Sequence, residues 1–286
     1  MIKLENFEVV GWEAAIRGMR NPKNSWHRSD SAFTESAYVD SLNENNEVEQ
    51  LPVRFDALEI GPNDHTLMMA LAKGGPVHAK YRRMIHVYVD VTAPLYWWKE
   101  FDTYKVGTVA NSCSTMHKIH SKPFEVSDFS VEDLGIDVLA EWNDGDEVHL
   151  NLWEEKFKDI VWHLELLRNR YNNEPNPELK KKFWRALIQY LPSSYNQKRT
   201  VDISYETLAN IYEWRRNHKL DEWREVCKWI ESLPYSEIIT QPILEKNKKV
   251  DVEEIFALIE KVKEDNPYIK TELLSEFEDR LRKKVK

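Results

Sequence analysis

The chain has 286 residues, of which 42% are hydrophobic and 12% aromatic, so it can bury the core of one large domain. Its formal net charge of -9 argues against general binding of nucleic-acid backbones, because such binding requires a basic surface that displaces counterions. No stretch approaches the roughly 18 apolar residues of a membrane span, so we expect a cytoplasmic protein that contacts neither a membrane nor polymeric nucleic acid. The two cysteines, Cys113 and Cys227, are predicted to be free thiols.

The first part of the chain predicts two helices, a loop and a strand. Residues 13–19 suit a short helix, and residues 21–46 are polar and aperiodic, which is typical of a loop. Apolar residues at helical spacing predict a helix over residues 63–73, which ends at a Gly-Gly-Pro stop signal. In residues 84–93 apolar and polar side chains alternate, which predicts a strand with one buried face.

The segment of residues 104–117, YKVGTVANSCSTMH, carries the most information. Pro94 ends the predicted strand and suits the first turn of an aromatic helix over residues 95–102. The segment follows that helix directly, and we interpret it as a nucleotide-binding loop. Within it, the small residues 111–114 offer backbone N–H groups to an anion.

The second half of the chain is predicted to be largely helical. Apolar residues recurring at intervals of three and four indicate helices over residues 150–171, 177–190, 204–216 and 220–232. Beyond residue 234 the composition becomes highly charged, and residues 252–262 and 273–281 predict two amphipathic helices. We therefore expect a main domain of residues 1–234 and a charged helical extension of residues 235–286.

Several short sequences follow the predicted strand and helix in a fixed order. The strand ends in Ala93-Pro94, and a Leu191-Pro192 pair precedes a helical stretch at residues 203–215 and then Asp221-Glu222-Trp223. This order resembles the flavin-dependent thymidylate synthases. In that family an Ala-Pro strand end leads through a helix to an Arg-His-Arg-x-x-Ser motif, and a later Leu-Pro precedes an Asn-Ala-Arg-Ser-Leu helix. The resemblance covers about residues 65–116 and 190–229.

The resemblance implies an α/β (α+β) fold of the thymidylate synthase-complementing-protein type, with a mixed or antiparallel sheet flanked by long helices. It also implies an FAD flavoprotein of nucleotide biosynthesis, a methyltransferase that converts dUMP to dTMP. NADPH and methylenetetrahydrofolate would be its co-substrates. The family further implies a homo-oligomer, a homotetramer, whose nucleotide site lies at a subunit junction.

The chain departs from the family where the family holds FAD phosphates or the nucleotide. Thr103, Tyr104 and Lys105 stand at the Arg-His-Arg positions, and Thr108 stands at the first serine. Four further replacements complete the motif region: Asn111, Cys113, Thr115 and Met116. In the later helix the Asn and Arg of Asn-Ala-Arg become Ser204 and Glu206.

The residues that match the family's functional positions give the predicted site. By this resemblance Arg215 and His78 are the catalytic candidates, and the predicted cofactor-binding residues are Asn210, Lys105, Tyr104 and Thr103. The predicted substrate-binding residues are Lys198, Arg215, Asn111, Ser112, Cys113 and Ser114. His117 and His120 are spaced like a metal pair, but no third ligand is spaced to complete it, so no metal is predicted.

Each of these residues also has a purely structural interpretation. Arg215 and Lys198 suit solvated helix charges, His78 suits a turn, and Cys113 suits a neutral thiol better than a nucleophile that attacks the uracil ring. Two alternative functions stay open for the whole chain. One is a related flavin-dependent one-carbon transfer to a pyrimidine nucleotide, such as hydroxymethylation, and the other is a non-catalytic binding or assembly protein on the same fold.

Overall fold

The computed structural model describes residues 2–33, 37–42, 48–53, 58–135, 138–141, 147–150 and 153–246. The chain divides into two compact units, residues 1–240 and 241–286. The predicted helices at residues 252–262 and 273–281 lie outside the described residues. The charged extension from residue 235 therefore stays a prediction.

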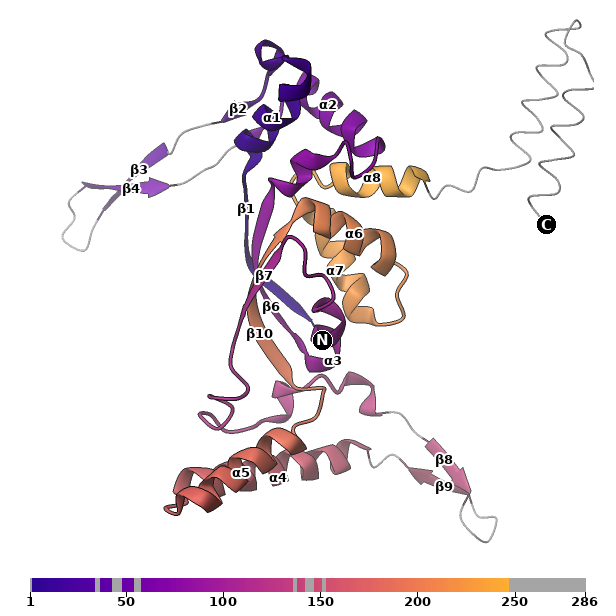
Figure 1. Ribbon diagram of the computed structural model, residues 1–286. Coiled ribbons are helices and arrows are strands. Elements are labelled where there is room, and N and C mark those ends of the chain that lie inside the picture. Colours follow the sequence, from indigo (N-terminus) through magenta and orange to yellow (C-terminus); the bar gives the residue numbers. More distant parts are fainter. Residues whose placement is uncertain are drawn as a thin grey trace, which may run out of the picture. The chain divides into compact units, whose positions relative to one another are not determined.

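The first unit is built on an antiparallel sheet of four strands in the order β1-β6-β10-β7, shown in Figure 1. In that order, the strands are Lys3–Val10, His86–Pro94, Asn196–Ser204 and Thr108–Ser112. Along β6, Val87, Val89 and Val91 are buried, whereas Tyr88 between them is 41% exposed. Because side chains alternate across a strand, the sheet has one buried face and one exposed face.

Three helices, α3 (Leu95–Phe101), α6 (Tyr205–Arg215) and α7 (Asp221–Ser232), lie on one side of the sheet (Figure 1). Trp97 on α3 packs against Trp223 on α7 with ring centroids 4.7 Å apart. Both rings are buried, and rings of this size contribute a large share of the apolar area in a core. Pro94 and Ser204 are the residues before α3 and α6, so β6 and β10 each run directly into a helix.

A buried ion pair joins the N-terminal helices α1 (Trp12–Arg20) and α2 (Pro62–Lys73). Arg20 Nε lies 2.5 Å from Asp64 Oδ1, and the two side chains are 4% and 0% exposed. The Ser29 and Ser31 hydroxyls each donate to Asp64 Oδ2 at 2.7 Å. These bonds satisfy a carboxylate that would be costly to bury alone.

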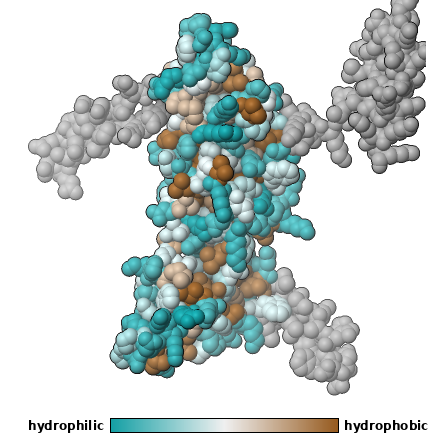
Figure 2. Space-filling view, viewed as in Figure 1, coloured by the Kyte–Doolittle hydropathy of each residue, from teal (hydrophilic) through white to brown (hydrophobic). Residues whose placement is uncertain are grey.

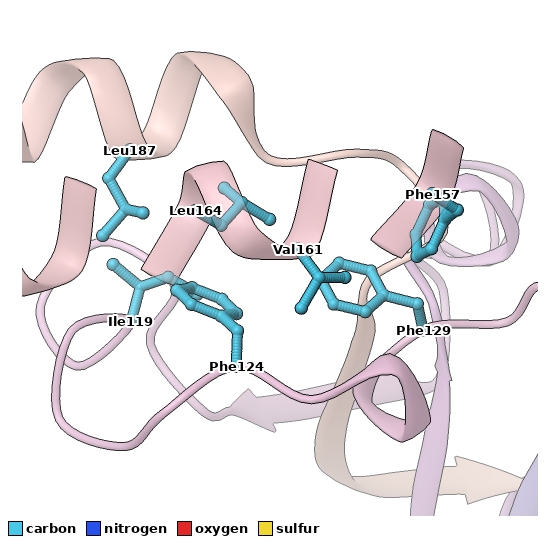
Figure 3. Packing of buried hydrophobic residues seen from close by; sticks show 7 residues of the cluster. All are labelled: Ile119, Phe124, Phe129, Phe157, Val161, Leu164 and Leu187. Atoms are coloured by element: carbon cyan, nitrogen blue, oxygen red, sulfur yellow. The ribbon is translucent and has the colours of Figure 1, made fainter. Parts of the chain in front are cut away.

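The helices α4 (Trp153–Asn173) and α5 (Pro177–Tyr190) form a hairpin that packs against the segment after β7. The Asn176 side chain caps α5 by accepting hydrogen bonds from the N–H groups of Glu178 and Leu179. The buried cluster in Figure 3 consists of Ile119, Phe124, Phe129, Phe157, Val161, Leu164 and Leu187. Side chains from residues 119–129 thus share a core with both helices of the hairpin.

The remaining described elements are short strand pairs and one helix. The pairs are β2 (Ala32–Phe33) with β5 (Leu58–Glu59), β3 (Ala37–Leu42) with β4 (Val48–Val53), and β8 (Val138–Glu141) with β9 (Glu147–Leu150); the helix is α8 (Glu237–Lys246). Figure 2 shows hydrophobic residues in small separate groups on a mostly hydrophilic face. Within the described ranges, no helix is both long and apolar enough to cross a membrane.

The structure confirms most of the predicted helices and corrects several other elements. Helices α1 to α7 and strand β6 lie where the sequence predicts them, within a few residues. The prediction of a loop is wrong for residues 32–33, 37–42 and 108–112, which form β2, β3 and β7. Residue 150 ends β9 instead of starting a helix. Strands β1 and β10 were not predicted, because their charged and amide side chains hide the alternation.

Candidate functional site

A pocket of about 640 Å³ opens at one end of the sheet, between the strand ends and residues 113–132. We call it the basic pocket, because Lys3, Lys118, Lys122 and Lys198 line it. Its other polar wall residues include Ser114, Ser121, Ser127, Asn196 and Gln197, and its rings are Phe124, Phe129 and Tyr195. Aromatic rings beside convergent cations and amides are features of a small-molecule site.

The strand register brings two of the lysines together. Lys198 on β10 is opposite Thr92 on β6, and Thr92 is opposite Lys3 on β1. Residues directly opposite one another in antiparallel strands point to the same face of a sheet. The two ammonium groups therefore project from one face, flanking the Thr92 side chain.

Backbone hydrogen bonds fix the segment after β7 against the start of β10. Cys113 N–H donates to the Lys198 carbonyl oxygen at 2.9 Å, and Gln197 Nε2 donates to the Cys113 carbonyl oxygen at 2.7 Å. The Ser130 hydroxyl donates to Asn196 Oδ1 at 2.8 Å. Three of the predicted substrate residues, Cys113 and Ser114 after β7 and Lys198 on β10, thus come from two segments to line one pocket.

Two carboxylates, Asp128 and Glu132, also line the basic pocket, but two of its four lysines are in no ion pair with a described residue. Lys198 Nζ is 3.1 Å from Asp90 Oδ2, and Lys122 Nζ is 2.5 Å from Asp128 Oδ1. Hydrogen bonds from Thr200, Asn6 and Lys198 lower the pKa of Asp90 to about 2, so this carboxylate is charged at neutral pH. Lys3 and Lys118 form no ion pair with any described residue. These two ammonium groups can bind an anionic ligand without first breaking an ion pair.

Arg215, predicted to act on the substrate, lies elsewhere and is already bonded. Its Nη1 donates to Glu100 Oε2 at 2.7 Å and its Nε to the Tyr104 hydroxyl at 2.9 Å. Its guanidinium also lies 4.7 Å from the Trp223 ring centroid, and Trp223 Nε1 donates to the same Glu100 oxygen at 2.9 Å. The side chain is only 18% exposed and does not line the basic pocket. The described contacts thus make Arg215 a link between α3, α6 and α7.

The predicted cofactor residues are divided between bonded and unbonded side chains. Tyr104 accepts from Arg215, and the Thr103 hydroxyl donates to the Glu100 carbonyl oxygen at 2.7 Å. Lys105 and Asn210 are exposed and form no side-chain hydrogen bond with a described residue. They are therefore the two cofactor candidates that are available to a ligand.

A turn next to Lys105 rests on the first turn of α6. Thr207 Oγ1 donates to the Val106 carbonyl oxygen at 2.9 Å, and Ser204 N–H donates to that of Gly107 at 3.1 Å. Gly107 has a φ of +72°, and a Cβ there would meet the Ser204 and Thr207 hydroxyl oxygens at 3.0 Å. Only glycine fits this turn without strain. Asn210 is one helical turn beyond Thr207, on the same side of α6.

The other predicted residues are not gathered into the basic pocket. Asn111 and Ser112 belong to the edge strand β7, opposite Thr200 and Arg199, and neither lines the pocket. Both side chains are exposed. His78 is an exposed residue between α2 and the turn of Lys80–Arg83, away from the pocket lining. The structure therefore joins only part of the predicted set.

Sequence reasoning missed several pocket residues, above all Lys3, Lys118, Lys122, Tyr195 and Asn196. Lys118 and Lys122 follow the predicted loop at a spacing of four, and this pair of charges was a usable signal. Lys3 carried no such signal, because its place in the pocket depends on the pairing of β1 with β6.

The two cysteines are expected to differ sharply in reactivity. Cys113 is exposed, whereas burial, with Glu231 nearby, raises the pKa of the Cys227 thiol to about 12. A thiolate-specific reagent such as DTNB should therefore label one of the two thiols rapidly in the native protein, and Cys113→Ser should abolish that rapid phase. Both thiols should react after unfolding in guanidinium. Rapid labelling of the Cys113→Ser variant would contradict the buried position of Cys227.

Comparisons with known proteins give a structural likeness only. No protein-family model and no curated protein matches this sequence. The structure is similar to Helicobacter pylori thymidylate synthase X (ThyX) with FAD and dUMP, with 13% identity, a TM-score of 0.52, and coverage of 85% of this chain and 99% of that one. A second structure of flavin-dependent ThyX from Helicobacter pylori, complexed with FAD and dUMP, gives 14% identity, 84% and 98% coverage, and a TM-score of 0.50.

A more distant likeness is to PolB, a UMP/dUMP methylase from Streptomyces cacaoi bound with 5-Br dUMP. The identity is 13%, the coverage is 81% of this chain and 88% of that chain, and the TM-score of 0.47 is too low to establish a shared fold. The two ThyX structures do establish one. They confirm the predicted α/β fold of the flavin-dependent thymidylate synthase type.

Proposed function

We propose that this chain binds a pyrimidine nucleoside monophosphate, dUMP, in the basic pocket and methylates it as an FAD-dependent enzyme of the thymidylate synthase type. One observation carries the proposal: Cys113, Ser114 and Lys198, predicted as substrate residues from two separate parts of the sequence, line a single pocket with Lys3 and Lys118. The fold that holds this pocket is shared with ThyX enzymes crystallised with FAD and dUMP.

The basic pocket has groups for each part of such a nucleotide. Lys3 and Lys118 would bind the phosphate dianion, and Lys198 would join them by exchanging part of its contact with Asp90. Asn196 accepts from Ser130 through its oxygen, which leaves its side-chain N–H groups for a ring carbonyl. Phe124 and Tyr195 would contact the flat ring.

The turn of residues 105–108 fits the phosphate part of FAD. Lys105 supplies one ammonium, and the backbone N–H groups of Val106 and Gly107 form no hydrogen bond with a described residue. The Thr108 hydroxyl is buried and also without a partner among the described residues. Successive unpaired N–H groups at a left-handed glycine suit an anion. When bound, FAD would supply the hydride chemistry.

The role of this chain in that reaction is to bind, orient and hold charge. Asn210, one helical turn beyond Thr207, offers an amide to the cofactor. Arg215 fixes the Tyr104 side chain by donating a hydrogen bond to its hydroxyl. NADPH and methylenetetrahydrofolate as co-substrates, and a homotetramer with the site at a subunit junction, belong to the proposal through the family resemblance. The exposed sheet-face residues Tyr88 and Val109 support association of copies.

The proposed function is tested by flavin binding followed by complementation. Full-length protein incubated with FAD and separated from free flavin should retain the visible absorbance of oxidised flavin. Its gene should also rescue growth of a thymidine-requiring strain. Flavin retention without rescue would move the reaction to another one-carbon transfer, such as hydroxymethylation. Colourless protein that fails to rescue would overturn the flavoenzyme proposal.

One observation favours a second candidate, a non-catalytic binding protein on this fold. Three arginines outside the basic pocket are held by carboxylates of the same chain: Arg82 by Glu206, Arg199 by Asp102 and Arg215 by Glu100. Such pairs stabilise a fold and withhold the cations from a ligand. Binding of dUMP without any flavin retention would favour this candidate.

A further inference from the structure

A second pocket, of about 370 Å³, lies between residues 116–120 and the hairpin of α4 and α5. We call it the hairpin pocket. It is lined mainly by His117, His120, Tyr171, Lys180, Lys181 and Trp184, and no carboxylate lines it. The family resemblance does not cover α4 and α5, and none of the described contacts makes this pocket part of the basic pocket.

The walls of the hairpin pocket are held in place by hydrogen bonds across its base. Trp184 Nε1 donates to the Met116 carbonyl oxygen at 2.7 Å. Arg168 Nη1 and Asn172 Nδ2 donate to the His120 carbonyl oxygen at 3.4 and 3.3 Å. These bonds tie both helices to residues 116–120, so the rings are pre-organised before any ligand arrives.

The charge of the hairpin pocket is positive. Lys180 and Lys181 form no ion pair with a described residue, and Lys180 Nζ lies 5.1 Å from the Tyr171 ring centroid. His120 Nδ1 is buried and has no hydrogen-bond partner among the described residues. Burial, together with Lys118, Lys180 and Arg168, lowers the pKa of His120, as expected where cations gather.

The aromatic rings of the pocket differ in what they can bind. His120 packs 4.5 Å from Tyr171, between ring centroids, and Lys180 lies over the same tyrosine, so that ring is covered. Trp184 is bonded at its N–H and only partly buried. It is therefore the ring on which a flat ligand would stack.

We propose that the hairpin pocket is a second ligand site, which binds a nucleoside monophosphate with its base on Trp184 and its phosphate on Lys180 and Lys181. A ring with an attached phosphate uses both the aromatic and the cationic wall, whereas a neutral ring or a bare anion uses one. The volume is within the roughly 300–1,000 Å³ range of small-molecule pockets.

Equilibrium dialysis of full-length protein with AMP at physiological salt tests this site. AMP should bind saturably, and adenosine and inorganic phosphate should each bind at least about 10-fold more weakly. The double variant Lys180→Gln and Lys181→Gln should lower AMP affinity at least about 10-fold. Lys182→Gln, on the same helix but outside the pocket lining, is the matched control and should leave affinity unchanged.

Substitutions of Trp184 distinguish a loss of base stacking from a loss of folding. Trp184→Leu should weaken AMP binding at least about 5-fold, whereas Trp184→Phe should retain most of it, because base stacking on an aromatic ring needs no N–H group. Circular dichroism and the thermal midpoint show that each variant is folded.

The source of the nucleotide is read from a parallel titration with a short oligoadenylate. Binding much tighter than that of AMP, lost in the double variant, assigns the pocket to a nucleic-acid strand, whereas equal binding assigns it to free nucleotides. Both results support a nucleoside phosphate site. Absence of saturable binding of either probe would overturn it, as would a double variant that binds like Lys182→Gln.

Discussion

Replacing Asp64 with alanine is expected to lower the free energy of unfolding by about 3–5 kcal/mol, because the change leaves the Arg20 guanidinium buried without its carboxylate. Arg20 and Asp64 are 4% and 0% exposed, and Ser29 and Ser31 lose their acceptor as well. Urea denaturation followed by tryptophan fluorescence measures the loss. The urea concentration at half-unfolding should fall, whereas the dependence of the free energy of unfolding on urea concentration should change little.

The exposed pair of Arg17 and Glu13 is the matched control. These side chains are 64% and 67% exposed, so Glu13→Ala should change stability by less than about 0.5 kcal/mol.

Hydrogen bonds from Ser29, Ser31 and Arg20 outweigh burial and lower the pKa of Asp64. A lowered pKa gives stability that is present above about pH 4 and lost as the pH falls. In the Asp64→Asn variant the free energy of unfolding should therefore fall less steeply as the pH is lowered below about 4. Equal effects of Asp64→Ala and Glu13→Ala would contradict the buried pair.

The double variant Lys118→Gln and Lys198→Gln is expected to lower dUMP affinity at least about 100-fold, since each lost charge-assisted bond to phosphate contributes about 1.5–3 kcal/mol. Removing Lys198 also leaves the Asp90 carboxylate without its cation, so that its negative charge repels the phosphate. Calorimetric titration measures the change, in a chain that also carries Lys180→Gln and Lys181→Gln so that the hairpin pocket does not contribute.

A control with the same change of charge is the double variant Lys99→Gln and Lys182→Gln, made in the same chain that carries Lys180→Gln and Lys181→Gln. Neither residue lines the basic pocket. This variant should bind dUMP as the parent chain does. If it loses as much affinity as the Lys118 and Lys198 variant, the effect is one of net charge and the basic pocket is not the site.

The helices were predictable from the sequence, whereas most of the sheet was not. In α5 apolar residues recur at helical spacing between an Asn-Pro start and a Leu-Pro end, so local signals suffice. β6 was predictable because its buried residues Val87, Val89, Val91 and Ala93 alternate with polar or exposed ones. β1 contains no buried residue, β10 has charged side chains between its buried ones, and β7 is an edge strand whose pairing uses backbone groups. Their partners lie far away in the sequence.

Residues that line the basic pocket were predictable only where the family resemblance covers them. Cys113, Ser114 and Lys198 were found because the family resemblance aligned their positions, and the pocket brings them together. That Arg215 is bonded to Glu100 could not be predicted, since the pair joins residues 115 positions apart on different helices. Lys3 could not be predicted for the same reason, because its position in the basic pocket depends on how β1 pairs with β6.

The most direct test of the account is calorimetric titration of the full-length chain with dUMP and, separately, with deoxyuridine. FAD is present throughout, and the chain carries Lys180→Gln and Lys181→Gln. The account predicts saturable binding of dUMP, at least about 100-fold tighter than that of deoxyuridine, because Lys3, Lys118 and Lys198 bind the phosphate. Equal binding of the two compounds, or no heat of binding with dUMP from a folded protein, would contradict it.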